Sequence, residues 1–265
     1  MTKHLTLAAL LLLASTAAAQ PQYHGTCLIR DDARGEITTY QYANGRLVRK
    51  GGVAGMSWHY NPDGSLGMIN TEVDQHFFSY EDGRVSRIET KLEDADFNPY
   101  VFATRTFEYD ADGRMSVMHW ENIEGDVTDE RYRWSGDQLV GSTEQRNSYP
   151  PIRRRFTWDS QGRLASIRSG SRVVEQYTYD RAGFLQAITA GTDPATAPRF
   201  ELFTDQYGRT IAERYLHADQ ARVSQVETIH FEGVFPPGAV CGRIPQLPPG
   251  FPPREISSNW LRSRR

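Results

Sequence analysis

The stretch RRFTWDSQGRLASIRSGSRVVEQYTYDRAGFLQAI, residues 154–188, decides the fold because it contains the same unit twice. The first copy reads FTWDSQGRLASI from Phe156, and the second reads YTYDRAGFLQAI from Tyr177. Each copy has an aromatic residue, a turn that ends in glycine, and then a long apolar residue. A short unit that recurs at regular spacing indicates a repeat architecture.

The same unit can be followed along most of the chain. The aromatic residues before the turns of the seven clear copies are Tyr42, Tyr60, Tyr80, Tyr109, Trp134, Trp158 and Tyr179. The turn glycines are Gly45, Gly64, Gly83, Gly113, Gly162, Gly183 and Gly208, with Asp137 at the glycine position of the fifth copy. An eighth copy has Thr204 and Thr210 in place of the aromatic and the apolar residue, and a weak ninth copy covers Asp31–Ile37.

The segment before each turn alternates in a way that only a β-strand explains. Phe156 and Trp158 point to one side of an extended chain, while Arg155 and Thr157 point to the other. The same two-apart pair recurs in seven copies and accounts for 14 of the 30 Phe, Trp and Tyr residues. Each unit is therefore predicted to be a β-hairpin.

The turns carry their own chemistry. An aspartate follows the aromatic position in several copies, where its carboxylate can accept backbone N–H bonds two residues on. Glycine supplies the positive φ that closes the hairpin loop. The arginines that follow glycine are predicted to pair with the turn carboxylate at the solvent edge; they are Arg46, Arg84, Arg114, Arg163 and Arg209.

The strand after each turn carries apolar residues three positions apart, as in Leu164/Ile167 and Leu185/Ile188. Three is not a multiple of the strand period of two. Either a β-bulge resets the phase, or the second apolar residue faces the opposite side of the sheet. Both alternatives remain open from the sequence.

The recurring aromatic-Asp-x-x-Gly-Arg-Leu unit resembles the Rhs/YD-repeat family over residues 40–232. The resemblance implies one continuous antiparallel sheet, which in large members of the family curls into a hollow shell around a toxin. Large members also carry a self-cleaving D-P-x-G segment. Here Asp193-Pro194 is followed by Ala195-Thr196, so autoproteolysis is not expected, and about eight units are too few for a closed shell.

The aromatic side of the sheet needs a cover. About 15 large side chains at ~150 Å² each present ~2,000 Å² of apolar surface, far more than soluble monomers expose in one patch. We expect an all-β fold of tandem hairpins forming one long, twisted and curled antiparallel meander of roughly sixteen strands. The cover is the sheet itself, another chain, or the proline-rich tail.

The chain divides into four parts. Residues 1–19 read as a signal peptide, with Lys3, an apolar run from Leu5 and Ala17-Ala18-Ala19 before the cut. An N-terminal segment (20–38), the repeat domain (39–232) and an irregular tail (233–265) with seven prolines follow. We expect a secreted or periplasmic protein with no membrane span after signal cleavage.

The cysteine count bears on a disulfide, and the charge balance bears on the class of partner. Cys27 and Cys241 are the only two cysteines, and an isolated pair in an oxidising compartment is expected to form a disulfide. Such a bond would bring the tail to the N-terminal edge of the sheet. After signal removal, 29 Lys and Arg face 33 Asp and Glu, a balance that argues against a nucleic-acid partner.

The sequence carries no catalytic signature, and no metal or cofactor is expected. The leading hypothesis is a non-enzymatic binding or scaffold role toward a glycan or a cell-surface partner. A second is a companion or orphan remnant of a polymorphic-toxin system. A third is a hydrolase that uses the loop carboxylates Glu93, Asp94 and Asp96. The run Arg153-Arg154-Arg155 is interpreted as a strand start rather than an anion site.

Overall fold

The computed structural model describes residues 23–32, 34–52, 55–191, 198–216, 223–236, 239 and 241. The expected signal peptide and residues 242–265 of the tail lie outside this part of the chain, as does the Asp193-Pro194 pair. Within the described residues the secondary structure consists of β-strands and turns, as the alternation predicts.

The strands follow one another with short connections. They are β1 (His24–Asp31), β2 (Ile37–Ala43), β3 (Arg46–Gly51), β4 (Met56–Tyr60), β5 (Leu66–Thr71), β6 (Gln75–Glu81), β7 (Arg84–Glu93), β8 (Pro99–Tyr109), β9 (Met115–Asn122), β10 (Val127–Ser135), β11 (Gln138–Arg146), β12 (Ile152–Trp158), β13 (Leu164–Ser169), β14 (Arg172–Tyr179), β15 (Leu185–Ala190), β16 (Arg199–Thr204), β17 (Thr210–Leu216) and β18 (Val223–Val234).

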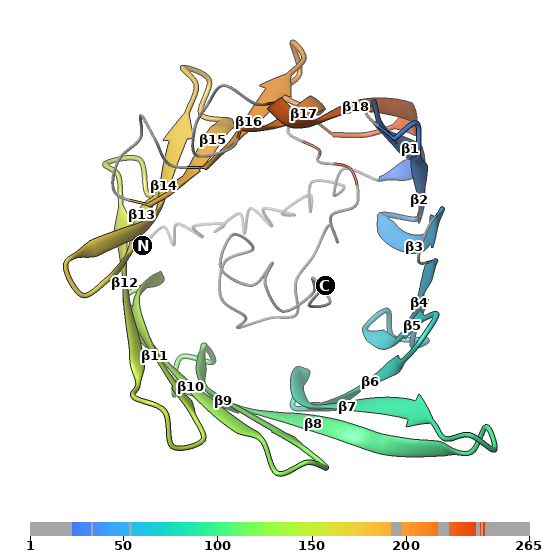
Figure 1. The fold of residues 1–265 in the computed structure, drawn as a ribbon, viewed down its shortest axis with the longest axis vertical. Coiled ribbons are helices and arrows are strands. Elements are labelled where there is room, and N and C mark those ends of the chain that lie inside the picture. The colour runs from blue at the N-terminus through green and yellow to red at the C-terminus, as the bar shows by residue number, and fades with distance from the viewer. Residues whose placement is uncertain are drawn as a thin grey trace, which may run out of the picture.

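The eighteen strands form one antiparallel sheet that closes on itself. Each strand pairs with the next along the chain, and β18 pairs with β1 over the whole length of β1. The ribbon therefore runs as a complete ring (Figure 1). The meander is confirmed, but the expectation that so few units could not close is wrong, because two strands beyond the predicted sixteen complete the ring.

The additional strands come from the two ends of the sheet. β1 lies in the segment 20–38 and β18 extends to Val234, so the sheet is wider than the predicted repeat domain. In the register of the seam, Ile229 faces Ile29 and Phe231 faces Cys27. β18 thus acts as the strand before a turn and β1 as the strand after it, although no turn joins them. A ninth hairpin-like unit forms from opposite ends of the chain.

A disulfide fixes this seam. Cys27 of β1 and Cys241 are bonded, with their Cα atoms 5.8 Å apart. Phe235, just after β18, packs edge-on against Tyr42 and Phe231. Thr210 N donates to Ala239 O, which holds the start of the tail against β17. The predicted bond is confirmed, and it joins the tail to a sheet that has already bent round to meet it.

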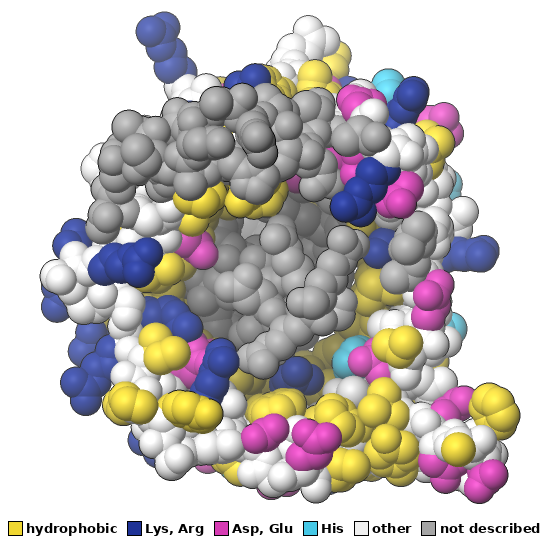
Figure 2. Space-filling view, viewed as in Figure 1, with side chains coloured by type: hydrophobic (Ala, Val, Ile, Leu, Met, Phe, Trp, Pro, Cys, Tyr) yellow, Lys and Arg dark blue, Asp and Glu magenta, His cyan; other side chains and the backbone are white. Residues whose placement is uncertain are grey.

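The two faces of the wall differ in character. The aromatic and apolar residues of the units form two buried clusters, one running from Val85 to Tyr177 and the other around Cys27. Figure 2 shows hydrophobic side chains gathered along the inner rim of the ring, with Lys and Arg projecting mainly from the outer rim. The face predicted to need a cover is therefore the concave one.

Candidate functional site

A β-bulge occurs at the same place in eight hairpins, directly before the second aromatic residue of the pair or, in the eighth copy, before Thr204. In the seventh hairpin Tyr177 pairs with Ile188 and Tyr179 with Leu185, so Gln186 is the extra residue. Leu185 and Ile188 consequently face the same side. The first of the two alternatives for the three-apart spacing is correct, and all such pairs contribute to the inner face.

Each bulge disturbs the hydrogen-bond pattern between its two strands, and for the first six bulges the next unit supplies a donor. A hydroxyl or indole N–H of the second aromatic residue donates to the carbonyl of the apolar residue that follows the preceding turn. The bonds are Tyr60 to Leu47 O (2.9 Å), Tyr80 to Leu66 O (2.8 Å), Tyr109 to Val85 O (2.7 Å), Trp134 to Met115 O (2.8 Å), Trp158 to Leu139 O (2.8 Å) and Tyr179 to Leu164 O (2.8 Å). We call these six bonds the aromatic ladder.

Burial keeps the phenols of the aromatic ladder protonated. Desolvation raises the pKa of Tyr60 to about 12 despite the nearby Arg46, and it does the same for Tyr109 despite Arg84. Both hydroxyls therefore remain hydrogen-bond donors over the whole physiological range.

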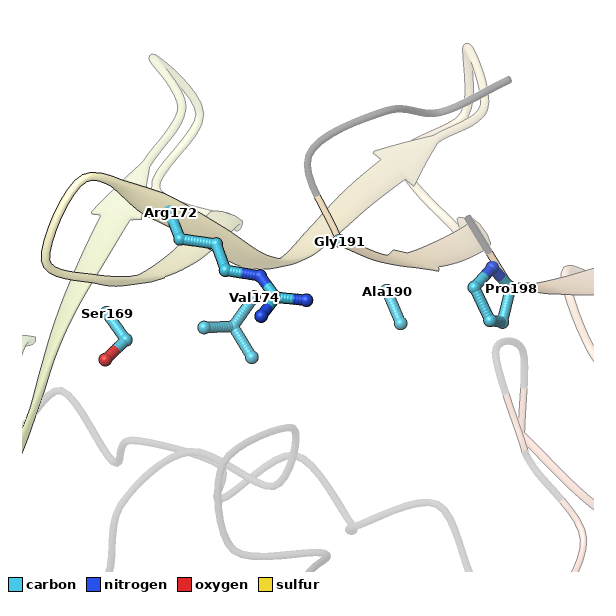
Figure 3. Close-up of a pocket in the computed structure, with 6 residues that line it drawn as sticks. All are labelled: Ser169, Arg172, Val174, Ala190, Gly191 and Pro198. Carbon is cyan, nitrogen blue, oxygen red and sulfur yellow. The ribbon is translucent and has the colours of Figure 1, made fainter. Parts of the chain in front are cut away.

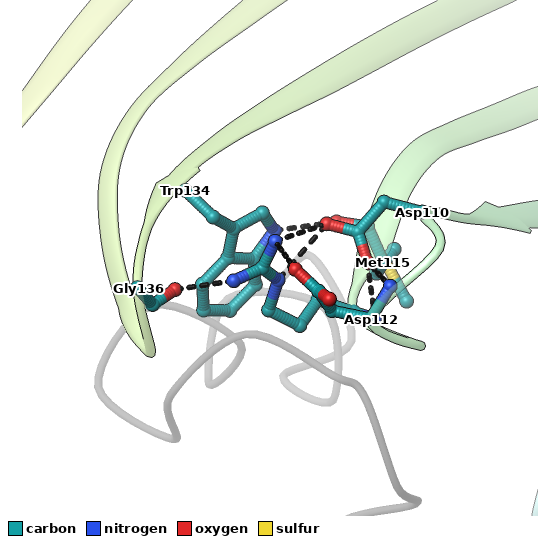
Figure 4. A network of polar contacts seen from close by, with 6 residues as sticks. Asp110, Asp112, Met115, Trp134 and Gly136 are labelled. Carbon is teal, nitrogen blue, oxygen red and sulfur yellow. Dashed lines mark hydrogen bonds and ion pairs between the residues drawn. The ribbon is translucent and has the colours of Figure 1, made fainter.

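The charged turn residues join the same network. Arg114 Nη2 lies 2.8 Å from Asp110 Oδ2 in its own turn, and its guanidinium lies 5.9 Å from the ring centre of Trp134 in the next unit. Figure 4 shows Asp110, Asp112, Trp134 and Gly136 converging on this point. Equivalent turn pairs join Asp159 to Arg163 and Asp205 to Arg209. The predicted pairing is confirmed for three arginines.

The turns differ in which residues supply the positive φ. All seven predicted turn glycines have φ between 73° and 91°. Asn44-Gly45 and Asp82-Gly83 have positive φ at both residues, as type I′ turns require. In the fifth copy Asp137 stands at the glycine position of the unit without a positive φ, and Gly136, at φ 55°, supplies it. The residues most characteristic of the repeat are thus engaged in joining the hairpins.

A polar cluster on the inner face of β10–β12 is a different kind of feature. Glu130 and Glu144 lie opposite each other in register. Arg154 Nη2 is 2.7 Å from Glu144 Oε2, and its Nη1 is 3.8 Å from Glu130 Oε1. Arg146 also bonds Glu144, and the Tyr132 hydroxyl donates to Glu130 Oε2 over 3.0 Å. We call this group the Glu130–Glu144 cluster.

The two carboxyls have opposite electrostatic surroundings. Desolvation raises the pKa of Glu130, and its bonds to Tyr132 and Arg154 only partly oppose this. Burial also acts to raise the pKa of Glu144, but hydrogen bonds from Arg154 and Arg146 outweigh it and hold the pKa below its usual value. Two carboxyls with divergent pKa values can serve as an acid and a base, but they also make a stable internal ion network.

Sequence reasoning missed this cluster. A weak signal existed, since Glu130 precedes Tyr132 by two residues and Glu175 precedes Tyr177 by two, and each glutamate accepts a bond from its tyrosine. Glu144 has no counterpart in the other units. Only the register of three consecutive strands brings it to Glu130 and Arg154.

A pocket of about 490 Å³ opens further along the inner wall. Ser169, Arg172, Val174, Ala190, Gly191 and Pro198 line it. Figure 3 shows these residues at the end of β13, in the first part of β14, and at or beside the end of β15 and the start of β16. The lining combines one guanidinium and one hydroxyl with small apolar side chains, which suits binding more than bond cleavage.

In the acidic loop between β7 and β8, the Asp94 carboxylate is bonded within its own turn. Asp94 Oδ1 accepts backbone N–H bonds from Asp96 (2.9 Å) and Asn98 (2.8 Å). The Asn98 bond is the main reason that the pKa of Asp94 is lowered. Phe97, at the tip, is 80% exposed with φ 62°. The Asp94 carboxylate closes a turn.

Within the described chain, no group of three or more His, Cys, Asp or Glu residues is arranged to hold a metal ion. Among the same residues no helix is long and apolar enough to cross a membrane.

No model of a known protein family matches the sequence, and a comparison with curated proteins gives no significant match. Several solved structures are similar in shape at low identity. In the TcdB2-TccC3-Cdc42 crystal structure, a chain matches at 13% identity and a TM-score of 0.44, with 78% of this chain and 13% of that chain covered. The Tc holotoxin pore of Photorhabdus luminescens matches at 12% identity and 0.42, covering 77% and 14%.

A porin-like protein from Bacteroides uniformis matches at 10% identity and a TM-score of 0.42, with 80% of this chain and all of that chain covered. The chain spans about 13% of the first toxin chain. Similarity at this level shows no family, so the resemblance to Rhs/YD proteins and the hypothesis of a toxin-system companion stay predictions.

Proposed function

We propose that this chain is a non-enzymatic binding scaffold that works outside the cytoplasm, secreted or periplasmic, toward a glycan or a cell-surface partner. The observation that carries the proposal is the closed, cross-linked wall. Its aromatic, aspartate and arginine side chains are largely engaged in holding hairpins together, which leaves the outer face for recognition.

The disulfide supports the proposed location outside the cytoplasm. Bonds of this kind persist in oxidising environments and are rare in the cytosol. Cys27–Cys241 closes the seam of the ring, so a reducing compartment would remove a link on which the architecture depends. The signal-like residues 1–19 agree with export. Cell fractionation with N-terminal sequencing tests this part, and a cytoplasmic protein that keeps residues 1–19 would contradict it.

A glycan array combined with a pull-down from the cell-envelope fraction tests the binding role. We expect at least one specific partner. Its binding to the immobilised protein should be competed by the same protein free in solution. The double variant Cys27→Ser/Cys241→Ser is the matched control for dependence on the closed ring. Blank results in both assays at high protein concentration would contradict the proposal.

The enzymatic alternative has its own test. A broad panel of glycosidic, ester and phosphoester substrates is expected to show no turnover. Turnover that is abolished by Glu130→Gln or by Asp94→Ala would overturn the non-enzymatic proposal, and each variant would identify which carboxylate is responsible.

A further inference from the structure

Five arginines lie together on the outer face of four consecutive strands. They are Arg131, Arg133, Arg153, Arg155 and Arg168, and we call them the arginine face. Successive side chains of a strand alternate between faces. Because Tyr132 and Phe156 belong to the inner cluster, the arginines on either side of Tyr132, and Arg155 next to Phe156, point outward. Lys and Arg side chains gather along the outer edge beside β12 and β13 (Figures 1 and 2).

The strand register arranges these residues as a grid. In one row Arg133 faces Gly141, Gly141 faces Arg155, and Arg155 faces Arg168. In the next row Arg131 faces Thr143, which faces Arg153. Neighbouring strands are about 4.8 Å apart and alternate residues about 6.8 Å apart. The result is an array of charges at regular spacing on the convex side of the wall.

At the centre of the grid, Gly141 contributes no side chain of its own. A Cβ at Gly141 would lie 3.1 Å from Arg133 Nη2 and 3.2 Å from Arg154 O. The Arg133 guanidinium therefore occupies the space over Gly141, on the side of its strand that faces Arg155. An anionic group above this point can contact both guanidinium groups.

The outward arginines are not neutralised by the protein. Among the described residues, Arg131, Arg133, Arg153 and Arg155 are exposed and make no ion pair with a carboxylate. The contrast with Arg154 is informative, because that residue lies between two of them in sequence and bonds two glutamates on the inner face. Arg168 donates one bond, to Ser171 O (2.8 Å).

The arrangement is unfavourable for the isolated sheet. Arg155 and Arg168 face each other directly across the β12–β13 pair, and like charges in that position destabilise a sheet. The protein as a whole carries a formal net charge of −3, so the charge of the arginine face is opposite in sign to the overall charge. Repulsion among five arginines is relieved when anions bind between them.

We propose that the arginine face binds an acidic polysaccharide, a glycan chain with regularly spaced carboxylate groups. This deepens the proposed function, on which it rests, by naming the ligand class and the surface. A grid on a convex surface gives little enclosure to a small anion. Repeated carboxylates engage several guanidinium groups at once, and arginine is suited to paired hydrogen bonding of a carboxylate.

Other polyanions fit the grid less well. A wall of four strands is wider than the ~12 Å major groove of DNA, and binders of single strands offer aromatic rings for base stacking. Within β10–β13 the two rows contain only Arg, Gly and Thr, and one valine flanks each row, Val117 opposite Arg131 and Val173 opposite Arg168. They offer no large apolar side chain to insert into a lipid surface.

The test compares polygalacturonate with neutral dextran of matched length by titration calorimetry on the intact, disulfide-bonded protein. We expect binding to polygalacturonate alone, weakened at least about tenfold by raising the salt from 50 to 300 mM. The variant Arg153→Glu/Arg155→Glu is expected to weaken it at least about tenfold, since two charge-assisted contacts become repulsive.

The matched control is Arg30→Glu/Arg49→Glu, which makes the same change in net charge on β1 and β3, across the ring. It is expected to bind like the parent protein. Thermal unfolding of Arg153→Glu/Arg155→Glu is expected at or above the parent temperature, because the opposed pair Arg155 and Arg168 becomes complementary. This separates lost binding from lost folding.

Equal weakening in both charge variants, or no binding to polygalacturonate, would overturn the inference. Tighter binding of single-stranded DNA or of anionic phosphatidylglycerol vesicles through the same arginines would overturn the ligand class. A neutral glycan that binds equally well to parent and Arg153→Glu/Arg155→Glu would leave the proposed function standing while refuting this site.

Discussion

The individual residue that matters most to this wall is an aromatic one with a polar end. A bulge makes room for the three-apart apolar pair but removes a carbonyl from the regular ladder. The phenol or indole of the next unit supplies the missing donor, as Tyr109 does for Val85 O at 2.7 Å. This explains why Tyr and Trp, and not Phe, occupy the second aromatic position in the six copies that make these bonds.

Tyr109→Phe tests that explanation. Removing the hydroxyl leaves the carbonyl of the buried Val85 without its partner, so we expect a loss of about 1–2 kcal/mol in the free energy of unfolding. Urea unfolding measures it. Tyr149→Phe is the control, because Tyr149 is 69% exposed and should change stability by less than about 0.5 kcal/mol. Equal losses in both variants would refute the role of the aromatic ladder.

Glu130 gives a prediction about pH. Burial raises its pKa, so the folded state holds the proton more tightly than the unfolded chain does. The stability that this gives is complete below the unfolded pKa of about 4.3 and is lost as the pH rises through the folded value. Glu130→Gln removes this titration and keeps an acceptor for Tyr132.

Accordingly, the stability of Glu130→Gln relative to the parent protein is expected to increase as the pH rises from about 4 toward neutrality. Thermal unfolding across that pH range measures the difference. A constant or decreasing difference would mean that Arg154 compensates the charge of Glu130 fully, and that the carboxyl is ionised in the folded protein without a penalty.

At the scale of the hairpin, most of the structure can be predicted from the sequence. Alternation of Phe156 and Trp158 predicts the strand, and Asp159 with Gly162 predicts the turn. The carboxylate of Asp159 accepts N–H bonds from Gln161 and Arg163 as expected. What the spacing could not decide was the bulge, because a reset phase and an opposite face produce the same three-residue interval.

Gly162→Ala tests the turn chemistry in isolation. The glycine has φ 74°, and a Cβ added there would lie no nearer than 3.9 Å to another side chain or backbone atom, Gln138 Nε2. The loss of stability therefore comes from backbone strain and not from a clash. We expect a loss of about 1 kcal/mol. Gly55→Ala, at a glycine without positive φ, is expected to be neutral or slightly stabilising. Chemical denaturation of both variants measures the contrast, and equal effects would contradict it.

At the scale of the whole molecule, the closure of the ring could not be predicted. The ninth unit has Ile229 and Phe231 on one strand and Cys27 on the other, separated by nearly the entire chain and without the glycine turn that marks the other units. The Glu130–Glu144 cluster escaped prediction for a related reason, since it depends on register across three strands. The cysteine pair was the one signal that linked the two ends.

Removing the disulfide should act on that seam. The bond spans 214 residues, for which the chain-entropy account gives a contribution of about 5 kcal/mol. Cys27→Ser/Cys241→Ser is expected to lose stability of that order in urea unfolding. The parent protein in reductant should match the double variant, and the double variant should not respond to reductant. An unchanged midpoint would show that strand pairing alone holds the seam.

Hydrogen–deuterium exchange of the intact, oxidised protein, resolved to individual strands, tests the closed ring most directly. The pairing of β1 with β18 and β2 predicts that amides of β1 are protected to a degree comparable with those of β10, in the middle of the sheet. Rapid exchange in β1 and β18 beside a protected β10 would show an open meander and contradict the closed ring.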